Sequence, residues 1–193
     1  MQGNLSPRGK VVALLAVASI GIAGCGEGGQ SAVQPTFSQL KSQLTGAPAN
    51  LAALHGQMGK VMPTGKDGFE RALQSVRGTP AVVNVWAPWC GPCRYEFPVF
   101  GEASMKLGKR VAFLGIASRD VPAASQRFLD SHPVGYPSWA DSDGSLGRSL
   151  GIAAGMPATV IYDRGGRRAF IHQGPYASLA DLERDINRYG NAK

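Results

Sequence analysis

Short apolar runs alternate along this chain with segments of helical periodicity. Residues 80–87 and 110–118 are nearly unbroken apolar runs of strand length, which is typical of strands buried on both faces of a sheet. The segment between them has helical character up to about Leu107 and ends at Gly108. This order predicts a strand–helix–strand unit with two parallel strands.

Further elements are predicted on both sides of this unit. Helical periodicity occurs in four more segments, residues 50–61, 67–76, 122–131 and 179–189. Residues 159–163 and 168–173 have the composition of strands and flank a Gly-Gly turn, which predicts a hairpin. The whole pattern predicts an α/β fold with a central mixed sheet flanked by helices.

The N-terminus has the pattern of an export signal. Arg8 and Lys10 precede an apolar run at residues 11–23, which is too short to span a bilayer comfortably. Small residues stand at the two positions before Cys25, and this end of the run resembles the lipobox of bacterial lipoproteins. The resemblance implies that Cys25 becomes the diacylated first residue of the mature chain. A plain signal peptide, or an uncleaved anchor, is the alternative.

The next segment is poor in large apolar residues. Gly, Gln, Ser, Ala, Thr and Pro dominate it, which predicts a flexible tether, although Phe37, Leu40 and Leu44 fit one face of a short helix. We therefore expect three parts: a lipoprotein signal peptide at residues 1–24, the tether at 25–48 and a single folded domain at 49–193.

The charge of the chain is modest and dispersed. The formal net charge is +7 over 193 residues, and removal of Arg8 and Lys10 with the signal would lower it by two, to +5. No run of five or more basic residues occurs, which argues against a nucleic-acid partner. A basic balance instead favours an anionic membrane surface or acidic partners.

Two cysteines stand where the first predicted strand passes into its helix. The segment reads VVNVWAPWCGPCRYEFP, and Cys90 and Cys93 in it have the spacing of a small disulfide ring. The first sulfur would lie near the first helical turn, where unpaired backbone N–H groups and the helix dipole favour a thiolate. We therefore expect Cys90 to be the attacking nucleophile and Cys93 the buried resolving thiol.

Half of a zinc site is the alternative for this spacing. A structural zinc ion takes four ligands, normally with a second Cys or His pair. Only Cys25 and the scattered His55, His132 and His172 are available, so we expect neither a metal site nor a cofactor. His172 fits the face of a strand better than a ligand role. A lipidated Cys25 would leave one even pair of cysteines, as suits an exported protein.

The cysteine segment carries a family resemblance. Residues 86–94, WAPWCGPCR, resemble the active-site segment of the thioredoxin superfamily. Glu96-Phe97-Pro98 directly after it is similar to the extracytoplasmic branch that contains TlpA, ResA and CcmG. The likeness covers about residues 50–190 and implies the thioredoxin-like fold.

The resemblance also implies further site residues. Trp89 would cover the site with an apolar plate, and Met156-Pro157 matches the cis-proline position opposite the cysteines. The backbone of Met156 would then pair with an extended substrate peptide.

A proton-transfer residue is expected on the helix that begins at the cysteines. Thioredoxin itself carries a buried acid six residues before the first cysteine, whereas this chain has Asn84, which has no proton to exchange. Glu96 lies one helical turn beyond Cys93 and resembles the glutamate of the ResA-like branch. We expect it to be a partly buried carboxyl with a raised pKa that takes the proton of Cys93. A solvated surface glutamate is the alternative.

The resemblance implies a lipid-anchored thiol:disulfide oxidoreductase at the outer face of the cytoplasmic membrane. Its partners would be exported proteins with thiols or disulfides and a membrane-bound thiol protein that gives or takes electrons. Relatives in this branch mostly reduce their substrates, for instance the cysteine pair of apocytochrome c, which must be in the thiol form before haem attachment. The Gly-Pro dipeptide between the cysteines is like that of reducing thioredoxins, so a reductase is favoured over a thiol oxidase.

Two other functions would also be compatible with this fold. A copper-handling assembly factor would resemble Sco-type chaperones, which use a wider cysteine spacing with a distal histidine. Two sulfurs alone would bind Cu(I) but leave Cu(II) without an imidazole. A redox-inert scaffold module is disfavoured by the intact active-site segment.

Overall fold

The computed structural model of this chain describes residues 1–3, 32–63, 65–152 and 154–191. Most of the predicted signal peptide, Cys25 and the predicted tether up to residue 31 therefore lie outside the described residues. Among the residues that the structure does describe, no helix has the length and apolar character needed to cross a membrane.

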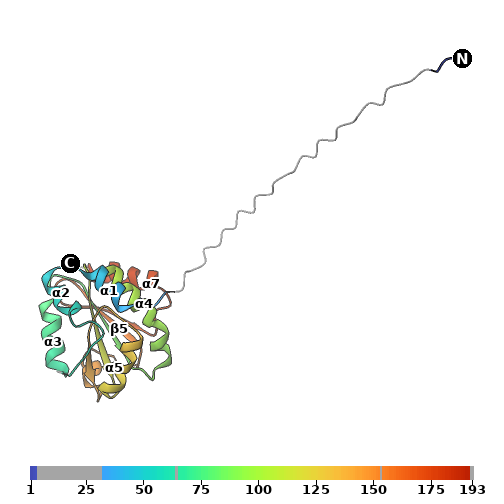
Figure 1. The fold of residues 1–193 in the computed structure, drawn as a ribbon. Coiled ribbons are helices and arrows are strands. Elements are labelled where there is room, and N and C mark those ends of the chain that lie inside the picture. Colours follow the sequence, from blue (N-terminus) through green and yellow to red (C-terminus); the bar gives the residue numbers. More distant parts are fainter. Residues whose placement is uncertain (4–31, 64, 153, 192–193) are drawn as a thin grey trace.

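A six-stranded mixed sheet forms the centre of the fold (Figure 1). In chain order the strands are β1 (Val61–Met62), β2 (Ala81–Trp86), β3 (Ala112–Ser118), β4 (Ser138–Asp141), β5 (Ala158–Tyr162) and β6 (Arg168–Gln173). Their order across the sheet is β1-β4-β3-β2-β5-β6, in which β5 runs antiparallel to both of its neighbours, β2 and β6, and all other neighbouring pairs are parallel. The predicted strand–helix–strand unit and the predicted hairpin are both confirmed.

Helices cover both faces of this sheet. They are α1 (Phe37–Leu44), α2 (Ala49–His55), α3 (Gly65–Ser75), α4 (Gly91–Leu107), α5 (Pro122–Ser131), α6 (Ser145–Ser149), α7 (Leu179–Asp185) and a π-helical turn η1 (Ile186–Gly190). Every residue of β2 is buried, because alternate side chains enter two separate cores. Val82 and Trp86 pack with residues of α4, α5 and α7, whereas Val83 and Val85 pack with residues of α2, α3 and α6.

The structure differs from the predicted tether over residues 25–48. Within that range α1 is a regular helix, and its Leu40 and Leu44 are buried. Leu44 fits where two glycines leave room, since a Cβ at Gly108 or Gly135 would lie 2.5 Å or 2.9 Å from its side chain. Figure 1 shows α1 beside α4. The folded part of the chain therefore includes α1 and begins before residue 49.

A core substitution tests whether α1 belongs to the folded part. Leu40 is fully buried, so we expect Leu40→Ala to lower the free energy of unfolding by about 3 kcal/mol. Ser42→Ala, at an exposed position of the same helix, is the control and is expected to change stability by less than about 0.5 kcal/mol. Urea unfolding measures both values. Equal midpoints for Leu40→Ala and the unmutated protein would show that α1 is not part of the cooperative fold.

The predicted helix over residues 50–61 is wrong at its C-terminal end. The helix α2 ends at His55, and Val61 belongs instead to β1, which pairs in parallel with β4 at the edge of the sheet. A two-residue strand is too short to show a period of two in the sequence, so only its partner strand reveals it.

Candidate redox site

The two cysteines form a disulfide at the carboxyl end of β2. The Cys90–Cys93 bond has an S–S distance of 1.98 Å and a Cα–Cα distance of 5.2 Å. Cys90 is the N-cap residue of α4, and its Sγ accepts a hydrogen bond from the backbone N–H of Cys93 at 3.2 Å. The relative exposure is 6% for Cys90 and 0% for Cys93, so only Cys90 of the two residues reaches solvent.

This geometry favours a thiolate on one sulfur only. In the reduced protein, the unpaired N–H groups and the positive dipole end of α4 would stabilise negative charge on Cys90. Cys93 lies inside the first turn among apolar residues, where burial favours the neutral thiol. Pro92 stands in the first turn of α4, where no partner is needed for the N–H that proline lacks. The arrangement suits an attacking thiol followed by a resolving thiol.

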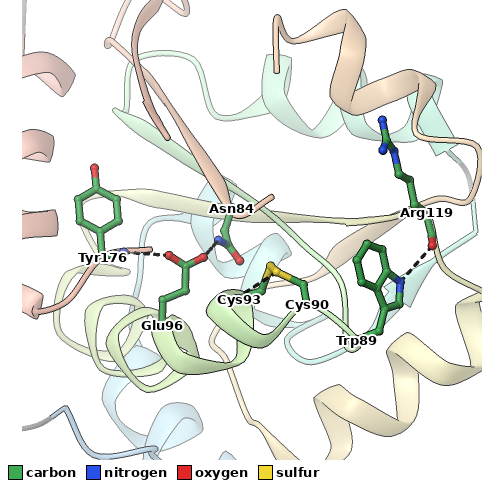
Figure 2. The surroundings of a disulfide bond; sticks show 7 residues. All are labelled: Asn84, Trp89, Cys90, Cys93, Glu96, Arg119 and Tyr176. Carbon is green, nitrogen blue, oxygen red and sulfur yellow. Dashed lines mark hydrogen bonds between the residues drawn. A yellow bond between two sulfur atoms is a disulfide. The ribbon is translucent and has the colours of Figure 1, made fainter. Parts of the chain in front are cut away.

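Trp89 lies on one side of the disulfide and is 59% exposed. Figure 2 shows its indole held by the loop that follows β3, where Nε1 donates a hydrogen bond to the carbonyl oxygen of Arg119 at 3.2 Å. Arg119 has a positive φ of 55°, which is uncommon for a residue other than glycine. The exposed indole ring of Trp89 therefore has a fixed position beside the disulfide.

The predicted cis peptide bond is confirmed between Met156 and Pro157. Because Ala158 is paired with Val85 in the sheet, this bond lies beside the end of β2 that carries the cysteines. No backbone hydrogen bond joins Met156 to another described residue, whereas the carbonyl oxygen of Pro157 accepts one from the N–H of Gly174 at 3.0 Å. The Met156 backbone is thus free to pair with an incoming strand.

Glu96 lies on the other side of the disulfide and is completely buried (Figure 2). Its Oε1 accepts a hydrogen bond from Asn84 Nδ2 at 2.7 Å, and its Oε2 accepts one from the backbone N–H of Tyr176 at 3.1 Å. Burial raises the pKa of Glu96 to about 8, and the two hydrogen bonds oppose that rise. The alternative of a solvated surface glutamate is therefore wrong.

The partners of Glu96 come from distant parts of the chain. Tyr176 follows β6, and its hydroxyl donates to Asp185 Oδ2 at 2.8 Å while its ring stacks on His172 with centroids 4.0 Å apart. These contacts hold the Tyr176 backbone against the carboxyl. Sequence reasoning did not find Tyr176, because 80 positions separate it from Glu96 and no local pattern marks a backbone donor.

The sheet places one more polar side chain near this carboxyl. Thr159 is the register partner of Asn84, so both side chains emerge on the same face of the sheet. Both residues are fully buried, and Thr159 Oγ1 and Asn84 Oδ1 have no hydrogen-bond partner among the described residues. Glu96 therefore lies in a small polar region inside an apolar core.

No group of three or more His, Cys, Asp or Glu side chains among the described residues could hold a metal ion. Cys25, the predicted lipidation site, lies in the part of the chain that is not described.

Comparison with known proteins gives consistent matches. A family model described as Redoxin matches residues 31–186. The thiol:disulfide interchange protein DsbE of Pseudomonas fluorescens biotype C is 35% identical over 133 residues, which cover 67% of this chain and 66% of that protein. The soluble secreted antigen MPT53 of Mycobacterium tuberculosis is 30% identical over 109 residues, which cover 56% of this chain and 61% of that protein.

Solved structures agree with these matches. The structure of MTB dsbF in its mixed oxidized and reduced forms is 34% identical and has a TM-score of 0.55, covering 60% of this chain and 84% of that one. The predicted thioredoxin-like fold is thereby confirmed. The chain spans 66% and 61% of the two curated relatives above, which is just under two thirds of their own length.

Proposed function

This chain belongs to the Redoxin family, and we propose that it is a thiol:disulfide oxidoreductase that acts on exported proteins through Cys90 and Cys93. The observation that carries the proposal is the N–H of Cys93 directed at the sulfur of Cys90 at the start of α4. A sulfur in that place is a good nucleophile and a good leaving group, because both roles depend on a stabilised thiolate.

The reaction follows from the order of the two sulfurs. In the reduced protein the Cys90 thiolate attacks a substrate disulfide, forms a mixed disulfide and releases one substrate thiolate. The Cys93 thiolate then attacks Cys90 Sγ, releases the second substrate thiolate and leaves the Cys90–Cys93 disulfide. The substrate gains two electrons and the protein loses two, which a dithiol protein on the donor side must replace.

Glu96 supplies the proton transfer that this sequence needs. Cys93 must lose its proton before it attacks, and must regain one when a donor thiol reopens the disulfide. A carboxyl with a pKa of about 8 is close to an ordinary thiol in acidity, so a proton can pass between them at little cost in free energy. Asn84 and the Tyr176 N–H keep the carboxyl oriented.

We favour the reducing direction. The Gly-Pro dipeptide and the resemblance to the TlpA, ResA and CcmG branch support it, with the disulfide of an apocytochrome c as one class of substrate. The secreted antigen and the DsbE relative support action outside the cytoplasm. A lipid anchor at Cys25 and a membrane-bound thiol partner are proposed from the sequence pattern alone.

An insulin assay tests the function and its direction. The protein reduced with dithiothreitol is expected to speed insulin reduction, and the double variant Cys90→Ser/Cys93→Ser is expected to match the rate without protein. Equilibration with glutathione buffers gives the reduction potential. A potential near that of thioredoxin, about −270 mV, supports a reductase, and one near about −120 mV would support an oxidase. A protein without effect on insulin would contradict the proposal.

A copper titration distinguishes a copper-handling function from disulfide exchange. Stoichiometric, tight Cu(I) binding to the reduced protein that abolishes insulin reduction would favour an assembly factor. Weak binding that leaves insulin reduction intact is the result we expect.

A further inference from the structure

A pocket on the Trp89 side of the disulfide takes no part in the exchange chemistry above. Its volume is about 180 Å³, and its walls include the residue before Cys90 and the residue before the cis proline. The larger side chains that line this pocket are those of Val85, Trp89, Arg119, Arg148, Ile152 and Met156. A polypeptide whose sulfur reacts with Cys90 would therefore pass directly beside it.

The inner part of the pocket is apolar and its rim is cationic. Val85 and Ile152 are buried, and Met156 and the exposed Trp89 complete the apolar walls. Arg119 and Arg148 are both exposed at the edge. The pocket thus offers contact for aliphatic carbon atoms inside and for a negative charge at its mouth.

The two arginines at the rim have acidic neighbours, so an acidic ligand would have to contact a guanidinium group directly. Three carboxylates on neighbouring loops are bound by other donors, Asp120 by the Ser125 hydroxyl, Asp141 by Ser118 and by the N–H groups of Leu146 and Gly147, and Asp143 by the Ser145 N–H. Arg148 donates to the backbone oxygen of Asp143, and its positive charge also helps to lower the pKa of the Asp143 carboxyl. Arg119 forms no ion pair with any described residue.

The backbone of Arg119 links the rim to the redox site. Its positive φ turns the carbonyl toward Trp89, and Figure 2 shows the side chain extending the other way, on the side of the disulfide opposite Glu96. The side chain lies over Gly144, where a Cβ would be 2.9 Å from Nε of Arg119. One residue therefore fixes the plate beside Cys90 and places a cation at the pocket.

We propose that this pocket binds an acidic side chain of the substrate polypeptide next to its reactive cysteine, with Arg119 as the specificity-determining residue. Glutamate fits best, because its methylenes would lie along the exposed ring of Trp89 while its carboxylate reaches Arg119 at the rim. The inference rests on the proposed function, since the pocket selects substrates only if Cys90 attacks a neighbouring sulfur.

Three matched peptides test this preference. Each carries one cysteine as a mixed disulfide with 2-thiopyridine, a neutral chromophoric leaving group, and either Glu, Gln or Lys beside that cysteine. The release of pyridine-2-thione by the reduced protein gives a second-order rate constant, which is divided by the rate constant for dithiothreitol to remove intrinsic reactivity. We expect the order Glu, Gln, Lys, with a Glu-to-Lys ratio of roughly threefold to tenfold that shrinks with added salt.

Charge reversal identifies the residue responsible. Arg119→Glu is expected to invert the order, and it keeps the backbone carbonyl that holds Trp89. Arg164→Glu makes the same change in net charge at the other end of the sheet, beside Gly78, and is expected to keep the wild-type order. An unchanged ratio in Arg119→Glu, or an equal shift in Arg164→Glu, would overturn the inference.

The same data separate the two proposals. Fast reaction of all three peptides at equal normalised rates would remove the acidic preference and leave the proposed function standing. No reaction with any peptide beyond that of an ordinary thiol would overturn the proposed function, and this inference with it.

Discussion

Replacing Cys90 by serine is expected to abolish disulfide exchange, lowering the rate of insulin reduction by roughly a hundredfold or more, as loss of a nucleophile does in other enzymes. Replacing Cys93 by serine is expected to leave the first attack intact and block the second. The variants differ because Cys90 reaches solvent and accepts the helix N–H, whereas Cys93 is fully buried behind it. Cys93→Ser should therefore accumulate mixed disulfides through Cys90.

Non-reducing gels and mass spectrometry of the trapped adducts measure this difference. A periplasmic or secreted protein extract supplies the substrates, and the double variant Cys90→Ser/Cys93→Ser is the control for adducts through other thiols. Adducts that form equally well in Cys90→Ser and Cys93→Ser would show that the two sulfurs do not have the assigned roles.

Glu96→Gln is expected to remove a large pH dependence of stability from the oxidised protein. An unfolded glutamate has a pKa near 4.3, and burial raises the folded pKa of Glu96 to about 8. Between these values the folded state holds a proton that the unfolded state has lost, so the free energy of unfolding falls as pH rises. The slope approaches about 1.4 kcal/mol per pH unit inside that window.

Urea unfolding of both proteins from pH 5 to pH 8 measures the effect. The difference between the unmutated protein and Glu96→Gln is the quantity of interest, because contributions of other groups, such as the lowered pKa of buried His55, cancel in it. We expect the variant to gain relative stability as pH rises. Glu96→Gln should also slow thiol exchange near neutral pH. Parallel stability curves would show that Glu96 is charged throughout.

Local patterns predicted the parts of the site that depend on neighbouring residues. The apolar run of β2, the cysteine spacing and the start of α4 lie within one continuous segment, so hydrophobicity and helix-start rules were sufficient for them. The Met156-Pro157 cis bond was available only through family resemblance, because no local rule distinguishes it from a trans proline in a loop.

Long-range packing determined what the sequence did not predict. The segment that forms α1 resembles a tether in composition, and the burial of its Leu44 depends on space left by Gly108 and Gly135, far along the chain. The Glu96 environment depends on Tyr176, and the cationic pocket depends on the backbone of Arg119. These features follow from the register of strands and the course of loops, which composition does not encode.

Ala32 and Asn191, near the two ends of the folded chain, lie beside different ends of helix α4. Ala32 lines a hollow with Arg94 and Tyr95, in the turn of α4 that follows the cysteines, whereas Asn191 lines one with Pro80 and Arg110, where β2 and β3 begin. A support or fluorophore coupled near Asn191 would leave the disulfide facing outward. Coupling just ahead of Ala32 would turn the disulfide toward the support or fluorophore. The position of the attachment therefore decides whether large substrates can approach the disulfide.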